Sequence, residues 1–266
     1  MDDLTQQAGI TAALDPPSLT VRFGPEVTAP EPERRAAADL GPVLYEPERA
    51  SADDLLYSVY RGVTPREQAE EIRRRGLVFV TTVLRGGTLR GSEERVRTRG
   101  HVNSAASSTR IGYPEAHEVW SGRGLLYLQQ GVDPAPQDIL TLMLAPGDKA
   151  VVAPGWAALM VNIGEEPLVL GTWRTDDCVT EYDAVVAQGG MAHFVLKSEN
   201  ARGYDLEPNP KYHTVVIPRE VTERDLPDFG LRRGEPMLTS FHRNPDFLRF
   251  LIRPQDYDHV WNTLYG

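Results

Sequence analysis

Several features are scarce or absent in this chain of 266 residues. It has a single cysteine, Cys178, which excludes an internal disulfide and a zinc site built from several cysteines. It has no run of eighteen apolar residues, so no ordinary membrane-spanning helix is expected. The first residues, Met1 to Leu4, are acidic and no apolar stretch follows them, so no signal peptide is expected. Together these absences predict a cytoplasmic protein.

An excess of positive charge is also missing. Lysine and arginine number 28 against 38 acidic residues, and the net charge is −10. Nucleic-acid partners are therefore not expected, because phosphate backbones are bound by basic surfaces. A small anionic ligand stays open, since Arg85 and the segment 90–99, with four arginines, form a local basic cluster. The alternative is a solvated hairpin with alternating charges.

The pattern along the chain predicts a mainly β fold. Residues 1–50 are rich in Pro, Glu and Ala and are expected to form an N-terminal arm on the surface. Residues 51–200 contain many short apolar runs separated by Gly and Pro turns, which is typical of a sandwich or barrel. Residues 201–266 form a C-terminal extension, in which the spacing of Tyr257, Val260, Trp261 and Leu264 indicates a helix that packs on the barrel or a partner subunit.

One local signal predicts a helix inside the barrel region. Thr64-Pro65-Arg66-Glu67 has the composition of a capping box, with proline at the first helical position. Gly76 follows three arginines and is expected to end the helix. The predicted helix runs from Pro65 to about Arg75.

Two stretches resemble the sequence motifs of a cupin. The first cupin motif has His-x-His followed by Glu, and the second has a further His four residues before an Asn; together they bind a metal. In this chain Thr98–Asn103 with Glu118 matches the first motif, and Pro154–Asn162 matches the second. His101 and Glu118 are present, but Asn103 and Ala158 stand where the other two histidines belong.

Residues 55–190 resemble the cupin-type phosphoglucose isomerases. The blocks that carry the resemblance are Phe79–Leu84, Thr98–His101, Glu118–Trp120, Trp156–Ala158 and Val161–Pro167. The resemblance implies a dimeric jelly roll, the cupin double-stranded β-helix. It also implies a divalent metal (Fe, Mn or Zn) held by three His and one Glu, and the interconversion of glucose 6-phosphate and fructose 6-phosphate through a cis-enediol.

The resemblance assigns roles to individual residues. Thr82 and Thr98 match phosphate-binding threonines, and Gly100 allows close approach of the backbone to a ligand. His101 matches a metal ligand, and Glu118 matches a ligand that also serves as the base. The remaining expectations are an active-site role for Tyr182 and substrate contacts from Asn103, Trp120 and Trp156. For the threonines, His101, Glu118 and Tyr182, a purely structural role is the alternative.

The departures predict an incomplete metal site. Asn103 offers a transition metal only a weak carbonyl oxygen, and Ala158 offers nothing. The family has a further histidine near the position of Thr180. We therefore expect either no cofactor or a weakly bound divalent metal. His117 and His193 are candidate replacements, although His117 should point away from Glu118 on a shared strand because alternate residues face opposite sides.

Three functions remain open. The first is a cupin enzyme repurposed, for example in biosynthesis, for acid–base isomerase or lyase chemistry with Glu118, His101 and Tyr182. The second is a sugar-phosphate aldose–ketose isomerase with a rebuilt metal site, and the third is a cupin that binds a ligand without chemistry. Each predicts a small-molecule ligand, phosphorylated or acidic, and a homodimer is expected.

Overall fold

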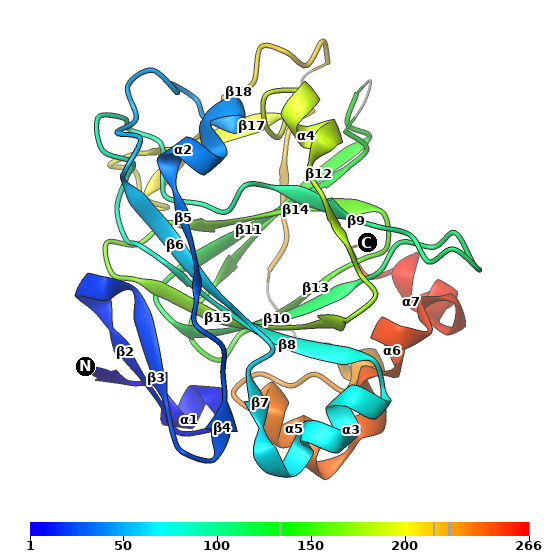
Figure 1. The fold of residues 1–266 in the computed structure, drawn as a ribbon. Helices are drawn as coiled ribbons and strands as arrows, with labels where there is room; N and C mark the ends of the chain where they lie inside the picture. The colour runs from blue at the N-terminus through cyan, green and yellow to red at the C-terminus, as the bar shows by residue number, and fades with distance from the viewer. Residues whose placement is uncertain (133–134, 215, 223–224, 266) are drawn as a thin grey trace.

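The computed structural model describes residues 1–132, 135–214, 216–222 and 225–265. Two six-stranded sheets face each other across a shared core (Figure 1). The first sheet contains, in spatial order, β13 (Lys149–Val152), β10 (Glu115–Ser121), β15 (Leu168–Thr175), β8 (Leu77–Leu84), β6 (Leu55–Arg61) and β5 (Glu33–Ala36). The second contains β16 (Thr180–Glu181), β9 (His101–Asn103), β14 (Trp156–Asn162), β11 (Gly124–Gln130), β12 (Asp138–Leu144) and β19 (Arg219–Glu220). The predicted mainly β jelly roll with a partly helical C-terminal extension is confirmed.

The first sheet is buried on both of its faces. Its inner face packs against the second sheet, and its outer face packs against N-terminal and C-terminal segments in a separate core. Every residue of β15 is buried, and so is every residue of β10 except Ser121. A strand covered on both sides reads as a continuous apolar run rather than an alternating one. The sequence of these strands therefore does not alternate between polar and apolar residues, and it does not show which residues face inward.

Aromatic packing fixes the outer face of this sheet. The rings of Phe79 and Trp120 stack at 5.9 Å between centroids, and Trp173 lies 4.9 Å from Phe79. A Cβ at Gly171 would meet the Phe79 ring at 2.4 Å, so only glycine allows this close approach. The aromatic layer contacts the C-terminal extension, since the Phe241 ring packs against Trp173 in a tilted arrangement with centroids 4.9 Å apart.

The C-terminal extension covers the outer face with short helices. They are α5 (Met237–Arg243), α6 (Arg249–Ile252) and α7 (Asp258–Trp261) (Figure 1). Phe229 joins them through ring contacts with Phe250 at 4.5 Å and Trp261 at 4.9 Å. None of the helices in the described part of the chain is long and apolar enough to cross a membrane.

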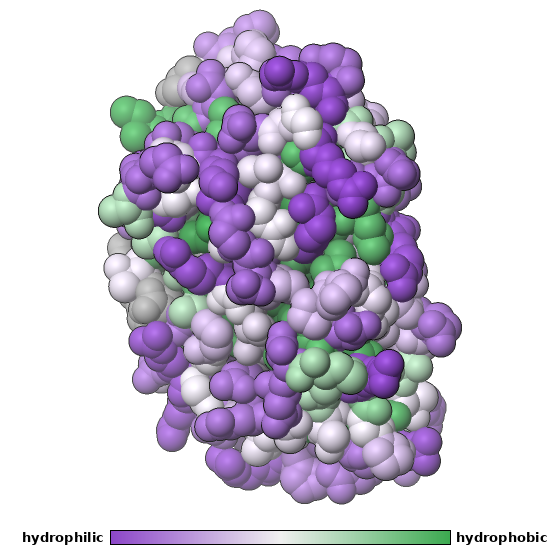
Figure 2. Space-filling model, turned by 90° about the vertical axis from the view of Figure 1, so that its left-hand side faces the viewer, coloured by the Kyte–Doolittle hydropathy of each residue, from purple (hydrophilic) through white to green (hydrophobic). Residues whose placement is uncertain are grey.

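The N-terminal residues contribute more than a surface arm. A small sheet of β1 (Asp2–Asp3), β2 (Ala12–Asp15) and β3 (Thr20–Phe23) is joined to the barrel by the Val21 N–H, which donates to the Tyr60 hydroxyl at 2.8 Å. Further along, β5 pairs with β6 and becomes the edge of the first sheet. The side of the molecule at the left of Figure 1 is mainly hydrophilic, with apolar side chains in small patches (Figure 2).

The remaining elements flank the barrel. The structure contains a β17–β18 hairpin (His193–Lys197 and Tyr204–Pro208), the short helices α1 (Thr5–Ala8), α2 (Ala37–Leu40), α3 (Ala69–Arg74) and α4 (Asp183–Ala187), and the pair β4 (Val27–Thr28) with β7 (Thr64–Pro65). The predicted start of the helix at Pro65 is wrong, because Thr64 and Pro65 pair with β4 and the Thr64 hydroxyl donates to the Gly62 carbonyl. Its predicted end is confirmed, with Gly76 at φ 61°.

Candidate active site

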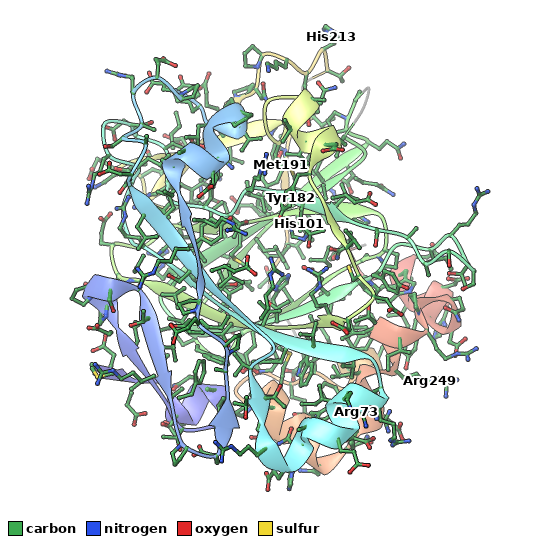
Figure 3. The ribbon with its side chains drawn as sticks, viewed as in Figure 1. Arg73, His101, Tyr182, Met191, His213 and Arg249 are labelled. Carbon is green, nitrogen blue, oxygen red and sulfur yellow. The ribbon has the colours of Figure 1, made fainter. Side chains whose placement is uncertain are left out.

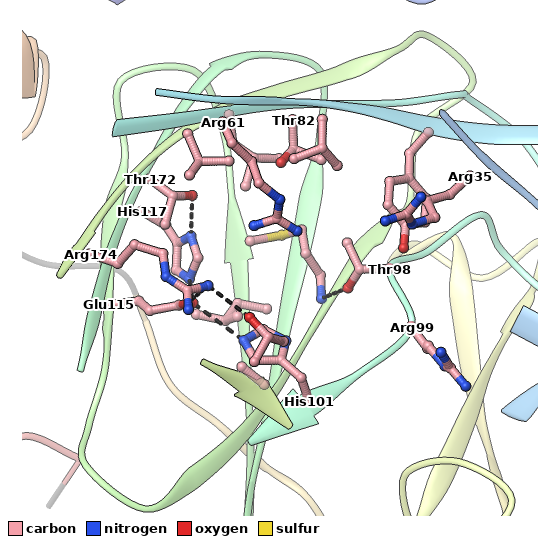
Figure 4. A pocket seen from close by; sticks show the side chains of 18 of the residues that line it. Arg35, Arg61, Thr82, Thr98, Arg99, His101, Glu115, His117, Thr172 and Arg174 are labelled. Atoms are coloured by element: carbon pink, nitrogen blue, oxygen red, sulfur yellow. Dashed lines mark hydrogen bonds and ion pairs between the residues drawn. The ribbon is translucent and has the colours of Figure 1, made fainter. Parts of the chain in front are cut away.

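A cavity of about 110 Å³ opens between the two sheets, inside the barrel (Figure 4). Its apolar wall includes Val80, Leu126, Ala158, Met160 and Leu170. Its polar lining comes from strands of both sheets and from the segments beside them: Arg35, Tyr57, Arg61, Thr82, Thr98, Arg99, His101, Glu115, His117, Thr172, Arg174, Thr180 and Tyr182. Among the ionised groups in this lining, Glu115 is the single carboxylate and four are arginines.

Glu115 lies between two imidazoles at one end of the cavity. Its Oε2 is 3.5 Å from His101 Nε2 and 3.4 Å from His117 Nε2, and its Oε1 is 3.2 Å from Arg174 Nη1 (Figure 4). Both Nε2 atoms are buried, and neither makes an aligned hydrogen bond within the described part of the chain. Two imidazole nitrogens and a carboxylate are thus directed at one small volume.

The charge state of Glu115 follows from these neighbours. Burial raises the pKa of this carboxyl, but His101 and His117 outweigh burial and hold the pKa well below its ordinary value. The carboxylate is therefore ionised at neutral pH. An ionised carboxylate inside a barrel, only 2% exposed, is in the protonation state that a general base needs, and its lowered pKa also makes it a weaker base than an ordinary glutamate.

The neighbouring side chains are held in fixed orientations. His117 Nδ1 shares a hydrogen bond of 2.9 Å with Thr172 Oγ1, which orients the ring and leaves Nε2 directed at Glu115. Arg174 Nη1 donates to Thr180 Oγ1 at 2.9 Å, and Nη2 donates to the Cys178 carbonyl. These contacts set the positions of the imidazole and the guanidinium before any ligand arrives.

Two further arginines, Arg35 and Arg61, line the cavity (Figure 4), and both also line a neighbouring pocket together with Arg174. Arg35 Nη2 and Arg61 Nε are both paired with the Glu33 carboxylate, at 2.7 and 2.9 Å. Burial raises the pKa of Tyr57 to about 12, so the phenol stays protonated and can donate a hydrogen bond. Thr82 and Thr98 add hydroxyls to the same lining.

His101 and Tyr182 are adjacent (Figure 3). Their ring centroids are 6.5 Å apart, and the Arg99 guanidinium lies over the Tyr182 ring, 4.8 Å from its centroid. The turn that precedes β9 requires Gly100, whose φ of 81° is unfavourable for other residues. Arg99 and His101, on either side of this turn glycine, both belong to the cavity lining.

The structure brings some of the expected site residues together and separates others. Thr82, Thr98, His101 and Tyr182 line the cavity, and Gly100 connects two lining residues. Three others lie outside the lining: the Asn103 amide donates to the Tyr113 carbonyl at 3.0 Å, Trp156 packs on Tyr265, and Trp120 belongs to the outer aromatic layer.

Glu118 is also outside the cavity, and its expected place there needs correction. Its carboxylate lies behind the first sheet and accepts hydrogen bonds from Trp120 Nε1 at 2.8 Å and from the Met237 N–H at 2.7 Å. Lys149 Nζ pairs with it at 3.2 Å. The reason is the two-residue period of a strand: Glu115 and His117 face inward, so Glu118 faces outward. The expectation that His117 points away from Glu118 is confirmed.

Sequence reasoning missed Arg35, Arg61, Glu115 and Arg174 as cavity residues and gave His117 only a minor place. A signal was available for Glu115 and His117, because two polar residues at i and i+2 share one face of a strand. No such signal existed for Arg35, which reaches the site only because β5 pairs with β6.

The positions at which the resemblance expects further histidine ligands do not supply a metal site. Ala158 lines the cavity but has no donor atom, Asn103 lies outside the lining, and His193 is buried against Tyr127 instead. No group of three His, Cys, Asp or Glu side chains in the described ranges is arranged to hold a metal ion. Moreover, the Glu115 carboxylate already has the Arg174 guanidinium as a counter-charge. A divalent cation on the same carboxylate would lie beside a full positive charge.

Comparisons with known proteins identify relatives of this chain. Residues 34–211 match the family model of glucose-6-phosphate isomerase. Glucose-6-phosphate isomerase from Pyrococcus furiosus is 28% identical over 146 residues, which cover 54% of this chain and 67% of that protein. The enzyme from Thermococcus litoralis is 28% identical over 161 residues, covering 60% and 74%.

Among solved structures, a variant of oxalate decarboxylase from Bacillus subtilis is similar over 47% of this chain and 28% of its own, with 18% identity and a TM-score of 0.32. The family match spans more than half of the chain, and it includes the strands that carry the Glu115 cluster and the cavity. This chain belongs to the cupin-type glucose-6-phosphate isomerase family.

Proposed function

We propose that this protein is an aldose–ketose isomerase acting on a sugar phosphate, with glucose 6-phosphate and fructose 6-phosphate as the first substrates to test. The observation that carries the proposal is the position of Glu115, ionised and buried between His101 and His117 inside the cavity. Aldose–ketose isomerisation needs a base for a carbon-bound proton and groups that exchange protons with two neighbouring oxygens. Membership of the family supports the same reaction class.

In this proposal the phosphate binds at the arginine end of the cavity. Arg35 and Arg61 supply two guanidiniums, and Thr82 and Thr98 supply hydroxyls. Guanidiniums bind phosphate through paired, charge-assisted hydrogen bonds. The Glu33 carboxylate keeps both arginines oriented in the absence of a ligand. The sugar carbons then extend toward Glu115.

The proposed step moves one proton between two carbons. The Glu115 carboxylate removes the proton from C2 of the aldose, and the electron pair of the broken C–H bond forms the C1=C2 bond of a cis-enediol. As the C1=O1 π pair moves onto O1, one of the His101 and His117 imidazoles gives O1 a proton, and the pair later takes the proton of the O2 hydroxyl; within the described part of the chain neither Nε2 makes an aligned hydrogen bond. Glu115 then returns its proton to C1 and the C2 carbonyl forms, so atoms and electrons balance.

The test is conversion of fructose 6-phosphate to glucose 6-phosphate by the purified chain, followed by NMR. Other hexose and pentose phosphates form the rest of the panel. Formation of the corresponding aldose supports the proposal. No interconversion of any sugar phosphate, from protein with a cooperative melting transition, would contradict it.

A second candidate is acid–base isomerase or lyase chemistry on another small acidic molecule. Arg174 beside Glu115 favours it, because this guanidinium could hold a substrate carboxylate. The same panel, extended to phosphorylated sugar acids, separates the two. A cupin that binds such ligands without chemistry would show stabilisation without turnover.

The proposal includes a homodimer in the cytoplasm, as the family resemblance and the sequence composition suggest. Light scattering of the purified chain tests the dimer directly. A monomer at micromolar concentration would contradict that part of the proposal and leave the chemistry unaffected.

A further inference from the structure

Arg174 has no counterpart in the metal site that the family resemblance implies. It lies on β15 and lines the cavity, and its side chain is only 9% exposed. A guanidinium is positively charged under all ordinary conditions, and burying it without a counter-charge costs free energy. Here it is paired with Glu115, the same carboxylate that the proposed reaction uses.

The anchoring of Arg174 involves a position where this chain departs from its family. Arg174 Nη1 donates to Thr180 Oγ1, and Thr180 stands near the place of a family histidine. Asn103 and Ala158 stand where two more histidines belong. Three positions at which the resemblance expects histidine thus carry other residues here. One of them, Thr180, holds the guanidinium of Arg174 in place.

We propose that the Arg174 guanidinium, and no bound metal ion, stabilises the negative charge that forms on the substrate oxygens. This inference rests on the proposed isomerase function. When Glu115 takes the proton from C2, negative charge develops on O1 of the enediolate. Arg174 borders the cavity beside Glu115, so its N–H groups stabilise that charge as it forms. Donors that are already oriented contribute most, because they need no reorganisation during the reaction.

The Cys178 carbonyl and the Thr180 hydroxyl hold the guanidinium from behind. A guanidinium carries five N–H donors, so donors remain for the substrate oxygen after these two contacts and the Glu115 contact. The two imidazole Nε2 atoms beside Glu115, which make no aligned hydrogen bond within the described residues, have a separate role. They exchange protons with O1 and O2, while Arg174 supplies charge and no proton.

The first test measures turnover and metal content together. We expect protein dialysed against EDTA, with metal quantified by mass spectrometry, to keep its isomerase rate within about twofold, and added Mn²⁺, Zn²⁺ or Fe²⁺ not to raise it. Arg174→Gln should lower kcat/KM by about 10²- to 10³-fold, as the loss of one oriented donor to an oxyanion does. Arg174→Lys should be intermediate. A rate that disappears with EDTA and returns with stoichiometric metal would overturn the inference.

The second test needs no turnover and keeps the inference distinct from the proposed function. The probe is 5-phospho-D-arabinonate, whose planar carboxylate resembles an enediolate, titrated into metal-free protein by calorimetry and compared with fructose 6-phosphate. Wild type should bind the arabinonate more tightly, and Arg174→Gln should lose that preference while keeping its affinity for fructose 6-phosphate. Equal preference in both proteins would overturn the inference even if isomerase activity is present. If no sugar phosphate turns over, the proposed function fails and this titration still decides the role of Arg174.

Thr180→Val provides a variant that keeps the charge. It removes one anchor of Arg174, so the arabinonate preference should fall by less than in Arg174→Gln. Its melting temperature should stay close to that of wild type, which separates loss of orientation from loss of folding. A preference unchanged by both substitutions contradicts the assignment.

Discussion

Glu115 and Glu118 lie on the same strand, three residues apart, and both are almost fully buried. Glu115 faces a cavity and is surrounded by side chains with unused hydrogen-bonding capacity. Glu118 faces a packed core, where Trp120, Met237 and Lys149 occupy its oxygens. The difference shows that burial and charge do not identify a reactive carboxylate; what matters is whether its partners leave room for a ligand.

The pKa values of the two carboxyl groups are also shifted in opposite directions. His101 and His117 lower the pKa of Glu115, although burial alone would raise it. At Glu118 burial outweighs Lys149 and the other donors, and the pKa is raised. Glu118 also lies at the N-terminus of α5, where its carboxylate accepts the Met237 N–H and fixes the C-terminal extension to the barrel.

The largest expected effect is the loss of activity in Glu115→Gln. We expect kcat/KM for the sugar phosphate to fall about 10³-fold, since an amide cannot act as a general base. Glu118→Gln should stay within about threefold of wild type while it is folded, because its side chain does not border the cavity. Steady-state kinetics on both variants checks this. Equal losses of kcat/KM in the two variants would contradict the assignment of the chemistry to the inner face of the strand.

The second effect concerns stability and should be largest on the outer face. Glu118→Ala leaves Lys149 buried without its partner, so the free energy of unfolding should fall by about 3–5 kcal/mol. The double variant Glu118→Leu with Lys149→Met should recover much of this, because no unpaired charge remains. Urea denaturation measures both. A loss below about 1 kcal/mol in Glu118→Ala would contradict a structural role for the pair.

A third effect separates phosphate binding from chemistry. Arg35→Ala or Arg61→Ala should raise KM about 10- to 100-fold with little change in kcat, because a charge-assisted hydrogen bond contributes about 1.5–3 kcal/mol. Arg34→Ala is the matched control. Arg34 is the exposed neighbour of Arg35 on β5 and is outside the cavity lining. If the control behaves like the other two, a general loss of positive charge explains the result.

The smallest effect is the pH dependence of stability, and the two carboxylates should differ in sign. Glu115 has a lowered pKa, so its contribution is present above the ordinary value of 4.5 and is lost as pH falls through its lower native pKa. Glu118 has a raised pKa, so its contribution is complete below 4.5 and is lost as pH rises through its native pKa. Unfolding free energies of Glu115→Gln and Glu118→Gln on both sides of pH 4.5 check this. If both variants keep the wild-type dependence of the unfolding free energy on pH, above and below pH 4.5, these assignments are contradicted.

The sequence could predict the barrel, but not which residues of β10 face the cavity and which face the outer core. Gly and Pro turns between short apolar runs led to the β fold, and the motif around His101 led to the cavity. Glu118 was expected to face the cavity because it precedes Val119-Trp120 in the family-like block. Because both faces of the first sheet are buried, no alternation of polar and apolar residues could correct that choice.

Other site residues depend on contacts distant in sequence. Arg35 lines the cavity because β5 pairs with β6, and Arg174 is oriented by Thr180 from a strand of the opposite sheet. Neither contact leaves a local pattern. By contrast, Thr82, Thr98, His101 and Tyr182 could be located from the resemblance, since they lie in or beside the blocks that carry it.

The most direct test of the account is the exchange of the carbon-bound proton. Fructose 6-phosphate is incubated in D₂O with wild type, Glu115→Gln or Glu118→Gln, and deuterium at C1 is followed by NMR. We predict incorporation with wild type and Glu118→Gln at similar rates, and at least about 10³-fold slower incorporation with Glu115→Gln. Incorporation that survives in Glu115→Gln and disappears in folded Glu118→Gln would contradict the assignment of the chemistry to the inner face.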